Sequence, residues 1–330
     1  MSVELTIDRL GAQGDGIAET PGGPLFVSFT LPGERIMAEL ARDGRHADCL
    51  AVLDASRERV APVCPHFGAC GGCSLQHLET QTYLAWKRDL VLQALASRGL
   101  DVPVEPVRAV PLGSRRRATF SLDRRGKDAG LGYRRARSHD TIEVVVCPIL
   151  SPAIVAALPA LKAMLLPLLG GPPEARVSIT ETETGLDVVM EGAPPPETAL
   201  AKLAGAAGAQ GIARITVGDE SVMLMPPSLR LGRAAVRVSA GDFLQASPAA
   251  ATEIVALVRA GVGKAKRVAD RFSGLGTLSF PLAERASVAA YENSAEALAA
   301  LEDAAQHTPK LKPMRGHPRD LFQDPLGWQE

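Results

Sequence analysis

The sequence predicts a multi-domain α/β protein, and three observations support this fold class. Short strand-like runs separated by tight turns fill residues 1–58. Residues 59–237 combine a cysteine-rich loop, two helical stretches and several hairpins, a mixture typical of an α+β domain. Residues 238–330 alternate strand and helix around a glycine turn, as in the first part of a doubly wound, Rossmann-like sheet. A chain of 330 residues can hold several domains, because one core rarely grows beyond about 250 residues.

With 46% hydrophobic residues, 22% charged residues and a formal net charge of -1, the chain has the composition of a globular protein. Its most apolar stretch, residues 154–169, is interrupted by Pro159, Lys162 and Pro167 and is shorter than the ~20 residues of a membrane span. No signal peptide is recognisable, so we expect a cytoplasmic monomer with no membrane partner. The near-neutral net charge does not exclude nucleic acid, since averaging hides local fields.

The first domain, residues 1–58, is predicted to be a small β-barrel. Leu5–Ile7 and Leu25–Phe29 are strand-like, and turns such as Asp15-Gly16 separate the strands. Barrels of this size often bind RNA on one face, although a purely structural cap would have the same pattern.

A loop at the start of the second domain carries three cysteines at C-x5-C-x2-C spacing, namely Cys64, Cys70 and Cys73. The two glycines before the third cysteine let the backbone pass close to whatever the thiolates hold. Cys147, which is followed by proline, is the best candidate for a fourth ligand. Disulfides are disfavoured, because the number of cysteines is odd and no secretion signal is present. A structural zinc ion and an iron–sulfur cluster both fit this spacing, which does not choose between them.

The rest of the second domain is predicted to be a scaffold of helices and hairpins. Residues 80–98 form a helix whose apolar stripe we expect in the core, and Gly99 is placed to end it. A helix over 153–169 and hairpins over 176–191 and 213–224 follow, without obvious chemistry.

Between these helices, residues 114–137 contain nine arginine or lysine residues against two aspartates. They flank two strand-like runs, Thr119–Leu122 and Gly130–Tyr133, so a two-stranded ribbon would display guanidinium groups suited to RNA phosphates. A solvated hairpin face is the other interpretation. The Ser138-His139-Asp140 run cannot form a catalytic triad, because neighbouring residues of an extended segment point to opposite faces. The RNA-binding candidates are Arg115, Arg116, Arg117, Arg134, Arg135 and Arg137.

In the third domain, a helix through Leu257 is followed by a strand over 267–270, a Gly274-x-Gly276 turn, a helix, and a second strand that ends at Glu292. The turn is not the dinucleotide motif G-x-G-x-x-G, because Ser279 stands at the third glycine position. Acids at the two strand ends, Asp270 and Glu292, suit a ligand with an ammonium group and a ribose, and S-adenosylmethionine has both. A tight structural turn is the alternative.

Together these features resemble the S-adenosylmethionine-dependent RNA (uracil-5-)-methyltransferases, specifically the branch that acts on 23S ribosomal RNA and carries a [4Fe-4S] cluster and an N-terminal TRAM barrel. The resemblance extends over essentially all 330 residues. It implies that S-adenosylmethionine is the cofactor and that the cluster is held by Cys64, Cys70, Cys73 and Cys147. The cofactor residues that the turn and the resemblance together predict are Gln245, Asp270, Phe272, Gly274, Gly276, Thr277, Glu292 and Asp320.

The chain also departs from the family pattern. Arg271 stands where the family has an apolar strand residue and Tyr291 replaces a small aliphatic one, and either would weaken cofactor binding if it were buried without a partner. The family's catalytic cysteine, an Asp-Pro-Pro-Arg segment and a glutamate follow the third strand, whereas all five cysteines here lie at or before Cys147. We therefore expect no catalytic residue in this chain and an incomplete sheet of about three strands.

Two functions follow from these expectations. The first is methyl transfer from S-adenosylmethionine to C5 of a uridine in 23S ribosomal RNA, through attack of a cysteine thiolate on C6 of the uracil. The alternative is an RNA-binding, iron–sulfur protein of the same lineage without turnover. An iron–sulfur oxidoreductase is disfavoured, because nothing in the sequence resembles a flavin or nicotinamide site.

Overall fold

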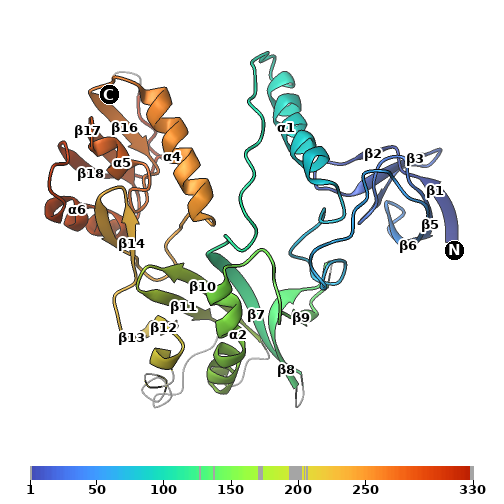
Figure 1. Cartoon of the computed structure of the whole chain (residues 1–330), viewed down its shortest axis with the longest axis horizontal. Coiled ribbons are helices and arrows are strands. Elements are labelled where there is room, and N and C mark those ends of the chain that lie inside the picture. Colours follow the sequence, from blue (N-terminus) through green and yellow to red (C-terminus); the bar gives the residue numbers. More distant parts are fainter. Residues whose placement is uncertain are drawn as a thin grey trace. The chain divides into compact units, whose positions relative to one another are not determined.

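The computed structural model describes residues 2–125, 128–136, 138–169, 174–192, 203, 205 and 207–327. The chain forms two compact units (Figure 1). Unit 1 consists of Met1–Ala109 and Tyr133–Ile142, and unit 2 consists of Val110–Gly132 and Glu143–Glu330. Each unit is described by itself. The domain boundaries expected near residues 58 and 237 remain predictions.

Unit 1 contains a six-stranded sheet of order β1-β5-β6-β4-β3-β2. Every neighbouring pair is antiparallel except β4 and β6. Apolar and polar residues alternate along the strands, so that Val27, Ile36 and Ala38 bury their side chains in one core. The strands predicted for this region are confirmed, and closure into a barrel remains a prediction. The strands are β1 (Ser2–Thr6), β2 (Arg9–Leu10), β3 (Gly16–Thr20), β4 (Gly23–Val27), β5 (Arg35–Leu40) and β6 (His46–Asp54).

The helix predicted after the cysteine loop is present as α1 (Thr80–Ala96). The Glu79 carboxylate accepts a hydrogen bond from the Thr82 backbone N–H at 2.9 Å and caps the start of this helix. The prediction that its apolar stripe lies in the core is wrong, because none of the residues of α1, all of which are described, is buried. Tyr83 and Trp86 instead pack, half-buried, on a small cluster made by Leu31, Leu75 and Leu78.

Unit 2 is built on a sheet of order β13-β12-β11-β10-β7-β8-β9, although β9 and the end of β8 extend into residues of unit 1. The predicted ribbon is present as β7 paired with β8, but β7 also pairs along its length with β10. Because it is paired on both sides, β7 is an inner strand of a larger sheet. Its apolar side chains Phe120 and Leu122 are buried on one face. The strands are β7 (Arg117–Arg125), β8 (Asp128–Arg134), β9 (Thr141–Glu143), β10 (Glu174–Thr182), β11 (Gly185–Glu191), β12 (Ile212–Val217) and β13 (Glu220–Met223).

Helix α2 (Pro152–Leu165) packs on strand β10. The predicted helix over 153–169 ends earlier than expected, because Pro167 cannot continue the α-helical ladder and the 3-10 turn η1 (Leu166–Leu169) follows. By length and composition α2 and η1 together could cross a membrane, a test that the core helix of a water-soluble protein also passes. Helix α2 buries Ile154, Leu158 and Leu161 inside unit 2, as a core helix does.

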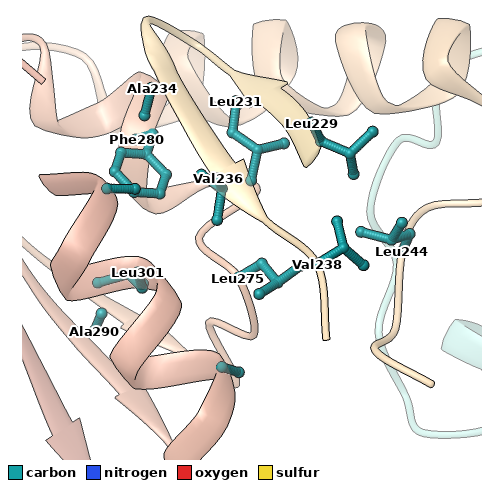
Figure 2. Packing of buried hydrophobic residues seen from close by; sticks show 12 residues of the cluster. Leu229, Leu231, Ala234, Val236, Val238, Leu244, Leu275, Phe280, Ala290 and Leu301 are labelled. Atoms are coloured by element: carbon teal, nitrogen blue, oxygen red, sulfur yellow. The ribbon is translucent and has the colours of Figure 1, made fainter. Parts of the chain in front are cut away.

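The C-terminal part of unit 2 is a parallel sheet of order β16-β17-β18 with helices between the strands, and it confirms the predicted α/β alternation. A buried cluster joins this part to the β14–β15 hairpin, and Figure 2 shows Val238, Leu244 and Leu275 packed together within it. The elements are β14 (Ser228–Leu231), β15 (Ala234–Arg237), α4 (Pro248–Val262), β16 (Arg267–Arg271), α5 (Ser279–Ala283), β17 (Ser287–Glu292), α6 (Ala295–His307) and β18 (Met314–Pro318).

Candidate functional site

The parallel sheet brings three predicted carboxylates to one edge. Asp270 lies near the end of β16, Glu292 ends β17, and Asp320 follows β18 by two residues. Because the three strands are parallel and in register, their carboxyl ends meet at the same edge of the sheet. That edge is where open α/β sheets bind their ligands.

Glu292 is held rigidly by backbone donors. Its Oε2 accepts a hydrogen bond from the Gly274 N–H at 2.9 Å, and its Oε1 accepts bonds from Asn293 at 2.9 Å and Ser294 at 3.0 Å. The bond to Gly274 ties the end of β17 to the glycine turn. A carboxylate offers about four acceptor sites, so this one retains capacity for a further donor such as a ribose hydroxyl.

Asp270 is turned toward the interior of the fold. It is 6% exposed, and its Oδ2 accepts a hydrogen bond from Ser279 Oγ at 2.5 Å. Burial raises the pKa of the Asp270 carboxyl above its ordinary value, while the hydrogen bonds from Ser279 act in the opposite direction. In this arrangement Asp270 fixes the start of α5, and its predicted contact with a ligand remains a prediction.

The turn between β16 and α5 runs through left-handed backbone positions. Phe272 has φ +58°, Gly274 has φ +52° and Gly276 has φ +90°. A Cβ on Gly276 would lie 2.8 Å from the Phe280 ring, so the turn needs glycine there for packing as well as for conformation. Ser273, 7% exposed, has a buried hydroxyl oxygen without a hydrogen-bond partner among the described residues. An orphaned hydroxyl in a glycine turn at this edge is consistent with a polar ligand beside it.

Beyond β18, Asp320 caps its own turn and an aromatic pair lies next to it. Its Oδ1 accepts hydrogen bonds from the backbone of Phe322 at 2.9 Å and of Gln323 at 3.3 Å. The rings of Phe272 and Phe322 lie 5.1 Å apart, and these residues are 56% and 88% exposed. Phe322 was not among the site residues predicted from the sequence, although an aromatic residue two positions after a predicted ligand-binding acid was a usable signal. Exposed aromatic rings at a ligand edge offer a stacking surface for a base.

The two departures from the family pattern do not create buried unpaired groups. Arg271 is exposed, and the Tyr291 ring stacks on the His317 ring at 4.9 Å from the neighbouring strand. The condition for weaker binding, burial without a partner, is therefore not met by Arg271, because this residue is exposed.

A pocket of about 560 Å³ lies elsewhere in unit 2, between the β10–β11 turn, β14, α4 and α5. Thr277 is the predicted cofactor residue that lines it, beside Arg116 of the arginine run. Gln245, the remaining predicted cofactor residue, is half-buried in the segment before α4.

The three arginines at the start of β7 have different surroundings. Arg115 is exposed, whereas Arg116 is half-buried and its Nε donates a hydrogen bond to the Gln245 carbonyl oxygen at 3.0 Å. Burial lowers the pKa of Arg116, while the nearby Glu181 and Glu183 act in the opposite direction. The Arg117 guanidinium lies 5.7 Å from the ring centre of Phe243, which is 74% exposed.

The remaining arginine candidates lie in unit 1, apart from one that the structure leaves out. Arg134 is hydrogen-bonded to His139 Nδ1 at 2.8 Å, and Arg135 is exposed. Arg137 lies outside the described residues. Since the arginines of β7 and these two belong to different units, the predicted single array of guanidinium groups remains a prediction.

The cysteine loop of unit 1 pairs with the chain that follows β8. The Gly71 N–H donates to the Arg134 carbonyl at 2.9 Å, and Cys70 forms a β-bridge with Arg135. A Cβ on Gly71 would lie 2.8 Å from that carbonyl oxygen, so the close approach requires glycine. The loop also holds buried side-chain nitrogens without a hydrogen-bond partner among the described residues, on His66, Gln76 and His77.

The described part of the chain contains no group of three or more histidine, cysteine or acidic side chains close enough to hold a metal ion. All five cysteines are described, and none is in a disulfide. Cys64, Cys70 and Cys73 belong to unit 1 and Cys147 to unit 2. The four-cysteine ligand set therefore remains a prediction.

No family model matches the chain. An archaeal structure, the Pyrococcus abyssi tRNA (uracil-54, C5)-methyltransferase in complex with S-adenosyl-L-homocysteine, matches with a TM-score of 0.70 at 18% identity, covering 95% of this chain and 79% of that one. This likeness shows a shared α/β methyltransferase fold.

Relatives found by sequence have higher identities to this chain than that solved structure has. An uncharacterized RNA methyltransferase of Caulobacter vibrioides is 42% identical over 333 residues, covering 98% of this chain and 80% of its own length. The 23S rRNA (uracil(1939)-C(5))-methyltransferase RlmD of Alkalilimnicola ehrlichii is 34% identical over 317 residues, covering 89% of this chain and 71% of its own length. Because these identities extend over most of each relative, the chain belongs to the RNA methyltransferase family.

Proposed function

We propose that this protein is an S-adenosylmethionine-dependent methyltransferase that modifies C5 of a uridine in 23S ribosomal RNA. The observation that carries the proposal is the meeting of Glu292, Asp320 and the glycine turn at the carboxyl edge of a parallel sheet. The relative at 34% identity, named for this reaction, supports the substrate class.

The chain's own side chains would bind the cofactor in separate ways. Glu292 would accept a hydrogen bond from a ribose hydroxyl, and the exposed rings of Phe272 and Phe322 would stack on the adenine. The orphaned Ser273 hydroxyl would donate to a polar group of the same ligand. S-adenosylmethionine, when bound, supplies an electrophilic methyl group.

Modification of uracil C5 also needs a nucleophile at C6, for which a thiolate is the suitable group. Of the five cysteines, Cys49 is poorly suited, because burial raises the pKa of its thiol and it packs against the core of the six-stranded sheet. Serial substitution of each cysteine by serine tests whether any of the five forms a covalent adduct with RNA. Loss of the adduct in a single variant would contradict the expectation that this chain holds no catalytic residue.

The cofactor assignment is tested by calorimetry with S-adenosylmethionine. We expect Glu292→Gln to weaken binding about tenfold, because it removes the charge that favours the ribose hydroxyls, which corresponds to about 1.4 kcal/mol. Glu253→Gln, on α4, is the control and should bind like the wild type.

Incubation of unmodified 23S RNA with methyl-labelled cofactor then tests the substrate. Label at uridine C5 supports the proposal, and cofactor binding with label on another base would contradict the uracil assignment.

We also propose that the cysteine loop holds a [4Fe-4S] cluster through Cys64, Cys70, Cys73 and Cys147. The orphaned side-chain nitrogens of the loop support a bound group there. Protein prepared without oxygen should be brown and contain iron and sulfide. Stoichiometric zinc in a colourless protein would contradict the cluster.

A further inference from the structure

The arginine run at the start of β7 divides into residues with different roles. We infer that Arg116 is a positioning residue for the cofactor, which it holds in place through the backbone of Gln245, rather than a contact for RNA phosphate. The inference rests on the proposed cofactor binding and on the role of Gln245 as a cofactor contact that the family resemblance predicts.

Residues 114–117 contact the segment 243–247 at successive positions. Ser114 Oγ lies 3.2 Å from Ser247 Oγ, and the Arg116 backbone N–H donates to the Ala246 carbonyl at 2.8 Å. The Arg116 side chain adds a second bond, from Nε to the Gln245 carbonyl at 3.0 Å. Arg116 is thus bonded to two consecutive residues of the segment, through its backbone and through its guanidinium.

This segment packs in the same buried cluster as the glycine turn. Leu244 is 2% exposed and packs in the same cluster as Leu275, the central residue of that turn (Figure 2). Its neighbours Phe243 and Gln245 are more exposed, at 74% for Phe243, because alternate residues of an extended segment point to opposite sides. The hydrogen bond from Arg116 therefore fixes the residue that follows the buried anchor.

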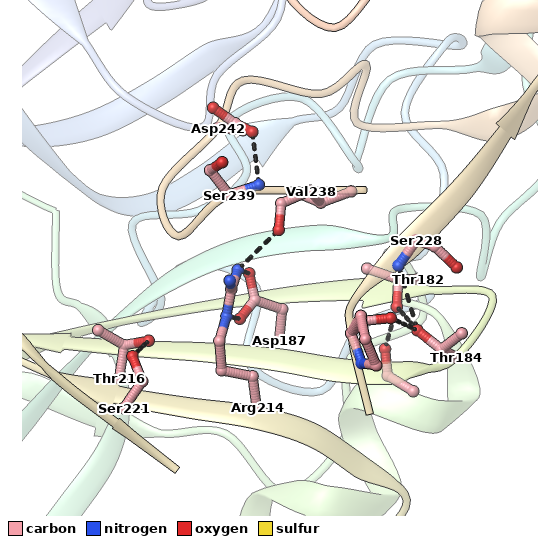
Figure 3. A network of polar contacts seen from close by, with 12 residues as sticks. Thr182, Thr184, Asp187, Arg214, Thr216, Ser221, Ser228, Val238, Ser239 and Asp242 are labelled. Atoms are coloured by element: carbon pink, nitrogen blue, oxygen red, sulfur yellow. Dashed lines mark hydrogen bonds and ion pairs between the residues drawn. The ribbon is translucent and has the colours of Figure 1, made fainter. Parts of the chain in front are cut away.

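A separate arginine holds the chain just before this segment. Arg214 forms a two-point ion pair with Asp187, both distances being 2.8 Å, and also donates to the Val238 carbonyl at 3.0 Å (Figure 3). The Asp242 carboxylate then accepts from the Ser239 N–H at 2.7 Å and tightens the turn. Because Arg214 and Asp242 fix the chain before the segment independently, loss of the Arg116 bond should loosen the segment at Gln245 without unfolding the sheet that contains β11 and β12.

The neighbouring arginine supplies a matched control. Arg115 carries the same charge one position away, and its side chain is exposed. If Arg116 positions the cofactor, its removal should change cofactor affinity, whereas removal of Arg115 should change only the response of RNA binding to salt.

The experiment measures two quantities in the full chain for Arg116→Ala, Arg116→Lys, Arg115→Ala and Gln245→Ala: the Kd for S-adenosylmethionine by calorimetry, and the salt dependence of binding to a 23S RNA fragment. We expect Arg116→Ala to raise the cofactor Kd about tenfold and leave the salt slope unchanged. Arg116→Lys should recover most of the affinity, because an ammonium group can still donate to the carbonyl. Arg115→Ala should leave the Kd unchanged and reduce the salt slope by about one.

The outcomes separate the inference from the proposed function. Normal cofactor affinity in Arg116→Ala with a reduced salt slope would return Arg116 to the phosphate contacts and overturn the inference, while weak binding in Gln245→Ala would keep the proposed site. If Gln245→Ala also binds normally, the assigned role of Gln245 is wrong as well. Near-ultraviolet circular dichroism checks the fold of each variant. If the alanine variant does not fold, Arg116→Gln carries the test, because it removes the charge and keeps an N–H donor: an unchanged salt slope supports the inference, and a reduced salt slope overturns it.

Discussion

At the scale of single residues, buried charge is used in unit 2 where two elements must stay in register. Asp187 of β11 and Arg214 of β12 lie on neighbouring strands, with side chains 3% and 10% exposed. Both oxygens of the carboxylate and two nitrogens of the guanidinium are engaged, and the guanidinium also serves the Val238 carbonyl. Breaking such a pair leaves a buried charge without a partner, which is costly.

Arg214→Ala should therefore lower the free energy of unfolding by about 3–5 kcal/mol, as measured by urea denaturation. The matched control is Arg176→Ala on the same sheet, which removes an exposed pair with Glu191 at 3.7 Å and should cost less than about 1 kcal/mol. Equal losses in the two variants would show that the Asp187–Arg214 pair is not a structural anchor.

At the scale of elements, the turn between β16 and α5 contains two glycines whose surroundings differ. Gly276→Ala should destabilise the protein by about 2 kcal/mol or more, because the new methyl group would collide with the Phe280 ring and φ +90° is strained for alanine. Gly274→Ala meets no atom within 4 Å and has φ +52°, so it should cost about 1 kcal/mol. Thermal unfolding of both variants gives the comparison, and a larger loss for Gly274→Ala would contradict this account.

The helices and strands were predicted better from the sequence than the neighbouring elements that pair with them or pack against them. Strict alternation and turn residues located the β10–β11 and β12–β13 hairpins and the strand, turn and helix around Gly276. The same alternation could not show that β7 has a partner on each side, since a strand pattern does not specify its neighbours. The stripe on α1 was misjudged for a similar reason, because periodicity shows an apolar face and not whether another element covers it.

At the scale of the whole molecule, the sequence pointed to the site through residues that are close together along the chain. Asp270 and Glu292 were recognisable because each lies at the end of a predicted strand, whereas Asp320 was assigned through the family resemblance. The Phe272 and Phe322 pair was not recognisable, since its members are joined only by the parallel pairing of the strands that precede them. The different surroundings of Arg115 and Arg116 could likewise not be predicted from the sequence, because the hydrogen-bond partner of Arg116 lies 129 positions later.

That separation has a consequence for how the protein is made. The contacts that fix Gln245 close loops of 129 and 133 residues, so they cost more chain entropy than any hairpin in the sheet. During synthesis from the N-terminus, residues 114–116 emerge long before the segment 243–247 that they contact. Unit 1 is interrupted as well, because residues Tyr133–Ile142 complete it only after part of unit 2 has been made. The cofactor site is therefore among the last parts of the chain to acquire its final geometry.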